Sequence, residues 1–238
     1  MQPSTDLEPF ATPSAASDGE TRLKLIIGSK NYSTWSMRPW LVLKAFHIPF
    51  DETVIALDQP GTGNLIAQYS AAGRVPVLID GELTVWDSLA ICEYLAERFP
   101  ERQLWPADVI ARANARSICA EMHSGFVGLR SAMWMNIRAR FPGKGRTVEA
   151  QADIGRISEI WENCFAHVGP HRFLFGEFSI ADAYYAPVVM RFISYGVALA
   201  PALEAYVQRV ADHPAVAEWV RDALEETNRA PRYDVYPD

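Results

Sequence analysis

Cysteine is scarce in this sequence, and long apolar runs are absent from it. The 238 residues include three cysteines, Cys92, Cys119 and Cys164, which are too widely spaced to form a metal-ligand motif. We therefore predict no metal site, and we expect the three thiols to be small buried apolar groups in a reducing cytosol. No apolar run reaches the roughly 18–20 residues that a membrane-spanning helix needs, so no membrane partner is expected.

Positive charge is also in the minority. Lysine and arginine number 22 against 29 aspartates and glutamates, which gives a formal net charge of −7 at pH 7. Nucleic acid requires a basic surface, so it is not an expected partner. Hydrophobic residues make up 49% of the chain, which is enough for a packed core. The N-terminus has neither the basic nor the apolar segment of a signal peptide, which favours a cytoplasmic protein.

Residues 1–21 are rich in proline, serine, alanine and threonine without periodicity, and we predict a disordered extension there. Residues 22–99 alternate between strand and helix patterns. A first strand leads to a helix with Pro39 near its start, and a second strand and a short helix follow. Two strands joined at Asp80 and Gly81 form a hairpin, and an amphipathic helix closes the set. This order of elements predicts an α/β thioredoxin-like domain.

Residues 107–238 show only helical periodicity, after a linker in which Pro100 and Pro106 break any helix. No strand pattern interrupts this part of the chain, so it predicts an all-α C-terminal domain. The expected helices cover residues 107–140, 146–168, 179–195, 199–210 and 213–226.

Pro76 stands at the start of the third predicted strand, where a proline cannot donate a hydrogen bond to a neighbouring strand. In a thioredoxin-like domain, a cis proline here turns the backbone N–H and C=O of Val75 toward a ligand. These two groups can then pair with an extended peptide as if it were another strand. We therefore predict a cis Val75–Pro76 bond at a peptide-binding edge.

Asp87 and Ser88 end a predicted strand and begin a predicted helix, so one of them is expected to be the N-cap. Capping alone would explain the pair. Alternatively, the helix N-terminus and Ser88 can bind a carboxylate while Asp87 accepts from an ammonium group. A ligand that carries both groups on one carbon is an α-amino acid. Together with the edge at Val75, the pair predicts a short peptide ligand with a free α-amino acid head.

The loop "SKNYSTWSMRPW", residues 29–40, carries several hydroxyl groups just ahead of the first helix. Such a loop can hold an anion, activate a nucleophile or cap the helix. Ser33 lies where its hydroxyl and the free helix N–H groups can act on one atom. We favour it as the activating group, with Asn31 and Tyr32 as alternatives.

Three segments together resemble the soluble glutathione transferase family over nearly the whole chain from Arg22. They are "GRVPVL", "DSLAI" and "GEFSIADAYYAP". The last is similar to the family's helix-capping motif, in which Ser179 caps a buried helix and Asp182 reaches back to it. The resemblance implies the glutathione transferase fold and is nearest to the serine-type and zeta-like branch. It also implies a cytoplasmic homodimer.

The resemblance assigns the ligand and the residues that bind it. It implies that Val75 pairs with the cysteinyl part of glutathione and that Asp87 and Ser88 hold the γ-glutamyl head. Arg74 would help to position the ligand or its glycine end. Aligning the first helix on Arg38 places the family's catalytic serine at Asn31, so the activating residue does not follow from the alignment.

The implied chemistry is activation of the glutathione thiol for attack on a small electrophile. A free thiol has a pKa of about 8.5, and lowering it by about two units requires about 2.7 kcal/mol. A hydrogen bond to a charged group supplies about 1.5–3 kcal/mol and a helix N-terminus about 0.3–1 kcal/mol. One well-placed hydroxyl is therefore sufficient without a metal. The loop contains no cysteine, which speaks against the thiol-transfer branch.

The segment "EMHSGFVGLRSAMWMNIRAR" supplies candidates for the electrophile pocket. They are Met122, Phe126, Arg130 and Trp134, although core packing explains such an aromatic and methionine stripe equally well. His123 is expected to be structural, and Arg130 is a candidate for steering an acidic electrophile. Two other functions stay open: an isomerase of the maleylacetoacetate type that recycles glutathione, and a glutathione-binding module without turnover.

Overall fold

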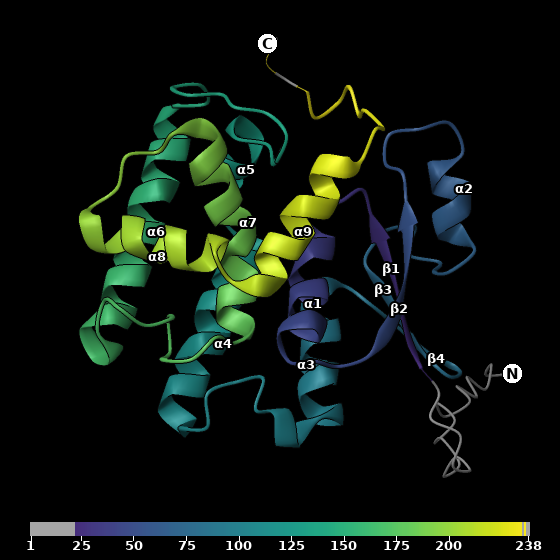
Figure 1. Ribbon diagram of the computed structural model, residues 1–238, viewed down its shortest axis with the longest axis horizontal. Coiled ribbons are helices and arrows are strands. Elements are labelled where there is room, and N and C mark those ends of the chain that lie inside the picture. The colour runs from purple at the N-terminus through teal and green to yellow at the C-terminus, as the bar shows by residue number, and fades with distance from the viewer. Residues whose placement is uncertain (1–21, 235, 237–238) are drawn as a thin grey trace, which may run out of the picture.

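The computed structural model describes residues 22–234 and residue 236. The extension predicted at residues 1–21 lies outside this range. A sheet occupies one side of the molecule and a bundle of helices the other (Figure 1). This is the predicted combination of an α/β domain with an all-α domain.

A four-stranded sheet forms the centre of the N-terminal half. β1 (Leu23–Gly28) pairs in parallel with β2 (Phe50–Ile55), and α1 (Thr34–Ala45) is the crossover between them. β3 (Val77–Asp80) is antiparallel to β1 and to β4 (Leu83–Trp86), which gives the strand order β2-β1-β3-β4. The predicted parallel pair and the predicted hairpin are both confirmed.

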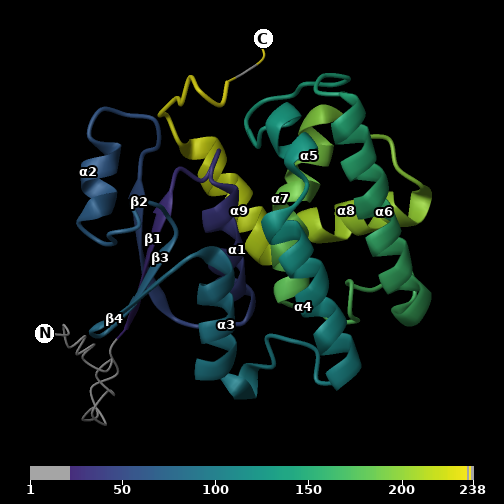
Figure 2. The same ribbon diagram turned by 180° about the vertical axis from the view of Figure 1, so that it is seen from behind.

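Helices cover both faces of the sheet. α1 and α3 (Ser88–Arg98) lie between the sheet and the helical half, whereas α2 (Thr62–Ala67) lies on the outer side (Figures 1 and 2). Ile66 of α2 packs against Ile26 of β1 in a small separate cluster on that side. The loop between β1 and α1 therefore lies at the junction of the two halves.

α1 begins one turn earlier than the sequence predicted. Ser33 is its N-cap and accepts a hydrogen bond from Ser36 N at 3.3 Å, so Pro39 lies inside the helix and not near its start. A proline in a helix interior removes one backbone hydrogen bond, which made the later start the natural prediction. As the N-cap, Ser33 places its side chain at the N-terminus of α1, the helix that lies between the sheet and the helical half.

The C-terminal half is helical, but one predicted helix is wrong. Residues 107–140 do not form a single helix, because α4 ends at Ser124 and Phe126 has a positive φ of 58°. The remaining predicted helices agree with the structure to within about two residues. The observed elements are η1 (Pro100–Arg102), α4 (Val109–Ser124), α5 (Val127–Ala132), α6 (Val148–Val168), α7 (Ile180–Tyr195), α8 (Pro201–Ala211) and α9 (Pro214–Glu225).

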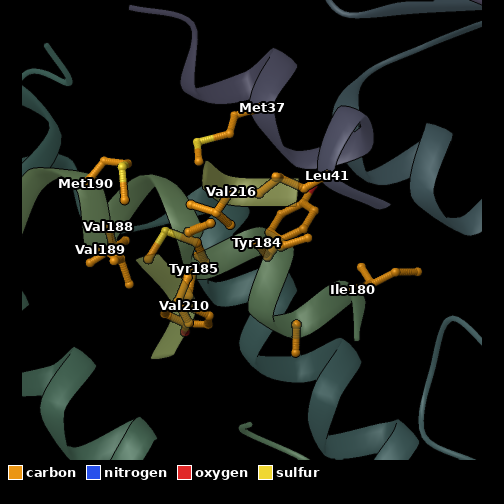
Figure 3. Packing of buried hydrophobic residues seen from close by; sticks show 14 of the residues in the cluster. Met37, Leu41, Ile180, Tyr184, Tyr185, Val188, Val189, Met190, Val210 and Val216 are labelled. Carbon is orange, nitrogen blue, oxygen red and sulfur yellow. The ribbon is translucent and has the colours of Figure 1, made fainter. Parts of the chain in front are cut away.

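α7 is the central helix of the molecule and is buried on nearly every side. Met37 and Leu41 of α1 lie over Tyr184 of α7 and Val216 of α9 (Figure 3). All four belong to one apolar cluster that extends from the sheet into the helical half. The two halves therefore share a core, which fixes the position of α1 relative to α7.

The N-terminus of α7 carries the capping box that the sequence predicted. Oδ2 of Asp182 accepts from the backbone N–H of Ser179 at 3.0 Å and from its hydroxyl at 3.2 Å. Oδ1 accepts from Leu174 N and from the hydroxyl of Tyr206, each at 3.0 Å. Asp182 is fully buried, and this burial raises its pKa to about 6, although the four donors act to lower it.

We expect Asp182→Ala to lower the free energy of unfolding by about 2–4 kcal/mol, because four buried donors lose their acceptor. Chemical denaturation followed by circular dichroism measures this loss. Asp108→Ala is the matched control, since Asp108 caps α4 by the same kind of bonds in an exposed position. The control should lose about 1 kcal/mol. Equal losses in the two variants would contradict a special role for Asp182.

The same carboxyl predicts a pH dependence with a definite sign. An unfolded aspartate has a pKa of about 3.9, so the folded protein, with a pKa of about 6, binds this proton more tightly. The resulting stability is fully present below about pH 4 and is lost as the pH rises through about 6. The stability difference between the unmodified protein and Asp182→Ala should therefore shrink over this window. If the stability difference instead grows with pH, folding lowers the pKa of Asp182 and does not raise it.

Candidate active site

Two adjoining cavities lie at the junction of the two halves. The strand-edge cavity has a volume of about 480 Å³, and the loop cavity has a volume of about 730 Å³. Trp35, Arg74 and Val75 line both of them. The strand-edge cavity is further lined by Ala72, Pro76, Trp86, Asp87, Ser88 and His123. The residues of the loop cavity include Tyr32, Ser33, Asp58, Arg130, Trp134, Arg191, Arg232 and Tyr233.

Val75 forms one wall of both cavities. The Val75–Pro76 peptide bond is cis, as predicted. Val75 precedes β3 and lies outside the paired register of β3 with β1 and with β4. Its backbone groups are therefore not part of the sheet ladder, which suits an edge that receives an extended peptide. Arg74, next to it, is exposed.

Asp87 is the N-cap of α3, with a positive φ of 75°. Its Oδ1 accepts from Leu89 N at 2.8 Å and from Ala90 N at 3.3 Å, so one carboxylate oxygen serves the helix. The other oxygen, Oδ2, lies 3.4 Å from Nε2 of His123, and both residues line the strand-edge cavity. Ser88 is buried, and its hydroxyl lies 3.0 Å from the hydroxyl of Tyr184. The pair therefore offers an acidic oxygen and a hydroxyl group at one helix tip.

His123 is a wall residue that sequence reasoning assigned to structure. Its Nε2 lies 3.4 Å from Oδ2 of Asp87, and its Nδ1 lies 3.3 Å from the hydroxyl of Tyr184. Partial burial lowers the pKa of His123, and the positive charges of Arg38 and Arg130 add to this, while Asp87 opposes it. No spacing signal could have found this contact, because Asp87 and His123 belong to different halves of the chain.

Ser33 lines the loop cavity and is 6% exposed. Its hydroxyl donates to Oγ of Ser36 at 2.7 Å, and Ser36 Oγ also accepts from Gly28 N at 3.0 Å. The two serines thus form a short hydroxyl chain from the end of β1 to the tip of α1. Because each hydroxyl can donate or accept, the direction of the bond between them can reverse.

Asn31 and Tyr32, the alternatives to Ser33, have different surroundings. Asn31 is fully buried and lines neither cavity: its amide donates to Asn136 Oδ1 at 2.9 Å, and its Oδ1 accepts from Arg138 N at 2.9 Å. Tyr32 lines the loop cavity, but its hydroxyl donates to Asp234 at 3.1 Å and accepts from Arg138 at 3.1 Å. Their polar groups are therefore already engaged with protein partners.

The loop before α1 is held by the C-terminal end of the chain. The carboxylate of Glu226 accepts from Lys30 N at 2.6 Å and from Asn31 N at 3.0 Å. The Lys30 carbonyl accepts from Trp219 Nε1 at 3.0 Å. The chain beyond α9 first runs toward the connection between β2 and α2 and then turns back (Figure 1). Sequence reasoning missed this contact, because Lys30 and Glu226 are 196 positions apart.

The four residues predicted to form the electrophile pocket separate into two pairs. Arg130 and Trp134 line the loop cavity. Met122 and Phe126 are buried in the central cluster and line neither cavity, because the chain turns sharply at Phe126. Two of the four predicted residues therefore belong to the core, and the other two belong to the cavity wall.

Residues 22–234 and 236 contain neither a cluster of candidate metal ligands nor a helix of membrane-spanning character. This part of the chain contains no group of three or more histidine, cysteine or acidic side chains that could hold a metal ion. None of its helices is long and apolar enough to cross a membrane. Cys92 and Cys119 are buried and Cys164 is partly buried, and burial raises the pKa of each thiol.

Comparison with known proteins identifies the family of this fold. The family model for "Glutathione S-transferase, N-terminal domain" matches residues 32–98, and the model for "Glutathione S-transferase, C-terminal domain" matches residues 108–222. The chain belongs to the glutathione S-transferase family. These matches do not distinguish the serine-type or zeta-like branch, which stays a prediction.

Curated members of this family and its relatives match at modest identity. The stringent starvation protein A homolog of Pasteurella multocida is 30% identical over 150 residues, which cover 61% of this chain and 66% of that protein. The dichloromethane dehalogenase of Methylorubrum extorquens is 40% identical over 60 residues, or 24% of this chain and 21% of that protein. The chain thus spans less than two thirds of the length of either. GstB of Escherichia coli K12 is 24% identical over 204 residues, 82% of this chain and 97% of GstB.

Solved structures of glutathione transferases share the fold. A glutathione transferase homolog from Burkholderia with bound glutathione is 25% identical and has a TM-score of 0.65. The match covers 86% of this chain and all of that chain. The human glutathione S-transferase T1-1 in its apo form is 23% identical with a TM-score of 0.67, over 90% of this chain and 93% of that one. The latter likeness concerns the fold alone.

We expect Glu226→Ala to loosen the loop before α1, because the amides of Lys30 and Asn31 lose their acceptor. The free energy of unfolding should fall by about 1–3 kcal/mol. Hydrogen exchange of these two amides should also become faster than in the unmodified protein. Glu225→Ala is the matched control, since the neighbouring Glu225 is exposed. Unchanged exchange in Glu226→Ala would show that other contacts hold the loop.

Proposed function

We propose that this protein is a glutathione transferase, which activates the glutathione thiol for attack on a small electrophile. One observation carries the proposal. A helix tip suited to an α-amino acid head and a hydroxyl at the tip of α1 line two cavities that share Val75. A tripeptide that spans both cavities would place its thiol beside the loop.

Glutathione binding is assigned to the strand-edge cavity. The γ-glutamyl carboxylate would bind to the hydroxyl of Ser88 and to the N-terminus of α3, where the helix dipole is positive. The ammonium group would bind to Oδ2 of Asp87, which is the oxygen that the helix cap leaves available. Val75 would pair with the cysteinyl backbone, and Arg74 would face the rest of the tripeptide from the boundary between the cavities.

Thiol activation is assigned to Ser33. Its proton points at Ser36 in the structure and would turn toward the sulfur when glutathione binds, while Ser36 donates to Ser33 in return. The hydrogen bond contributes about 1.5–3 kcal/mol to the thiolate and the α1 N-terminus about 0.3–1 kcal/mol. The thiolate then attacks the electrophilic carbon, a sulfur–carbon bond forms, and the leaving group departs with its electron pair. The thiol proton goes to solvent.

A glutathione-binding protein without turnover is the second candidate. It is favoured by the low exposure of Ser33 and by the bond that already occupies its proton. Turnover of 1-chloro-2,4-dinitrobenzene decides between the two functions, because a binding protein would retain glutathione without consuming it.

The wider proposal includes a homodimer. Its support is the exposed apolar surface of Leu83 and Trp86 on β4, which is one of the two edge strands of the sheet. An edge strand with apolar side chains is commonly covered by a partner.

We expect Asp87→Asn to weaken glutathione binding by about 10- to 100-fold, because the ammonium group loses its ionic partner. Asparagine keeps an oxygen for the α3 cap, so the fold should survive. Calorimetry with glutathione and with an analogue that lacks the α-amino group provides the test. The unmodified protein should discriminate strongly between these two ligands, and the variant should not. Equal discrimination in both proteins would remove Asp87 from the ammonium site.

We expect Ser33→Ala to raise the apparent pKa of bound glutathione by about one to two units, because the thiolate loses its donor. Thiolate absorbance in the ultraviolet during a pH titration measures the change. Thr34→Val is the matched control, since Thr34 carries a neighbouring hydroxyl on the same cavity wall. Affinity for glutathione should change little in either variant. An unaltered titration in Ser33→Ala would leave activation to the helix N-terminus alone.

A further inference from the structure

Three arginines, Arg38, Arg130 and Arg191, lie together beside the loop cavity. Arg130 and Arg191 line the cavity, and Arg38 is stacked between the rings of Trp35 and Tyr184, 4.4 Å from each centroid. None of the ion pairs within residues 22–234 and 236 includes any of the three. Nε and Nη1 of Arg38 are buried without a hydrogen-bond partner in the same part of the chain.

Carbonyl oxygens, not carboxylates, hold the two cavity arginines in place. Arg191 is 6% exposed and donates from Nε to the carbonyl of Met133 at 2.7 Å and from Nη1 to that of Pro187 at 3.1 Å. Arg130 donates from Nη2 to the carbonyls of Met122 and His123. These neutral acceptors orient the guanidinium groups without forming an ion pair, and the carboxylate of Asp153 offsets part of the positive charge of Arg130 from a longer distance.

The arginines raise one another's electrostatic energy. Burial lowers the pKa of Arg191 to about 9, and the charges of Arg130 and Arg38 contribute to this. Burial also lowers the pKa of Arg130 to about 10, with Arg38 as the next cause. Buried cations without a counter-ion are costly, and an anion that enters the cavity would relieve that cost.

The rest of the cavity wall favours the same kind of ligand. Arg74 and Arg232 add exposed positive charge, while the acidic Asp58 is exposed and already accepts from Arg232 N at 3.0 Å. The protein as a whole carries a net charge of −7, so this cavity is a local region of opposite sign. A cavity lined by one sign of charge concentrates ligands of the other sign.

Aromatic side chains define the remaining surface. The guanidinium of Arg130 lies 4.8 Å from the ring centroid of Trp35, and Trp134 packs against Tyr233 at 5.0 Å between centroids. Flat apolar walls beside a pair of guanidinium groups suit a conjugated or aromatic carboxylate. The ring would rest on the aromatic walls and the carboxylate would reach the arginines.

We propose that the electrophile of this protein is a small, flat carboxylate whose anionic group binds at Arg191 and Arg130 in the loop cavity. The proposal rests on the function proposed above, and it adds the chemical class of the second substrate. Its electrophilic carbon would lie toward Ser33, which lines the same cavity.

A matched pair of electrophiles tests the proposal. In both 4-chloro-3-nitrobenzoate and 4-chloro-3-nitrobenzamide the thiolate forms a sulfur–carbon bond, and chloride leaves with its electron pair. After correction for the rates without enzyme, kcat/KM for the carboxylate should exceed that for the amide by about tenfold or more. Arg191→Met should abolish this preference, and Arg191→Lys should keep part of it. Arg140→Met, which changes an arginine outside both cavities, should preserve it. A protein that treats both electrophiles alike would overturn the proposal.

Binding measurements separate this proposal from the catalytic one. Calorimetry compares S-(4-carboxy-2-nitrophenyl)glutathione with its carbamoyl counterpart, so the comparison needs no turnover and no variant that must fold. Tighter binding of the carboxylate conjugate without turnover of either electrophile supports the anion site and contradicts the catalytic function. Turnover of the electrophiles with equal affinities for the two conjugates supports the catalytic function and contradicts the anion site. If Arg191→Met weakens glutathione itself as much as both conjugates, the arginines bind the glycine carboxylate, and the proposal is wrong.

Discussion

The buried ammonium group of Lys30 is the contact on which the geometry of the site depends. It pairs with Glu52 of β2 at 2.9 Å and with Asp222 of α9 at 2.7 Å. It also lies over the rings of Trp40 and Trp219. One side chain therefore joins the sheet, α1 and the last helix. Because a buried charge is costly without its partners, the loop that carries Lys30 cannot shift without losing both ion pairs. The hydroxyl at the tip of α1, three residues further on, is fixed as a consequence.

Local signals in the sequence were sufficient for most of the fold. The caps at Asp87 and Ser179 and the hairpin all depend on residues close together in the chain, and the structure contains each of them. The contacts of the candidate site are different. His123 meets Asp87 across the two halves, and Glu226 meets Lys30 across almost the whole chain. No spacing pattern encodes such a contact, so only the folded arrangement reveals it.

The break between α4 and α5 was the largest error, and it has a physical cause. Helical periodicity continues through Gly125 and Phe126, yet Phe126 takes a left-handed conformation and buries its ring in the core. A phenylalanine rarely adopts a positive φ, so tertiary packing must stabilise it here. Because of this break, residues after Phe126 do not continue the apolar stripe of α4. Met122 stays in the core, whereas Arg130 and Trp134 line the cavity.

The same break explains how Arg130, which is half-buried, is held in place by hydrogen bonds to carbonyl groups. Met122 and His123 belong to the last turn of α4, where the helix leaves carbonyl oxygens without an internal partner and the helix dipole is negative. Arg130 donates to both carbonyls, so it caps the helix that the break has ended. Partial charges of this kind stabilise a cation by about 0.3–1 kcal/mol, which is less than the cost of burying one. The positive charge is thus held in position but not neutralised, and a carboxylate bound in the loop cavity would complete its coordination.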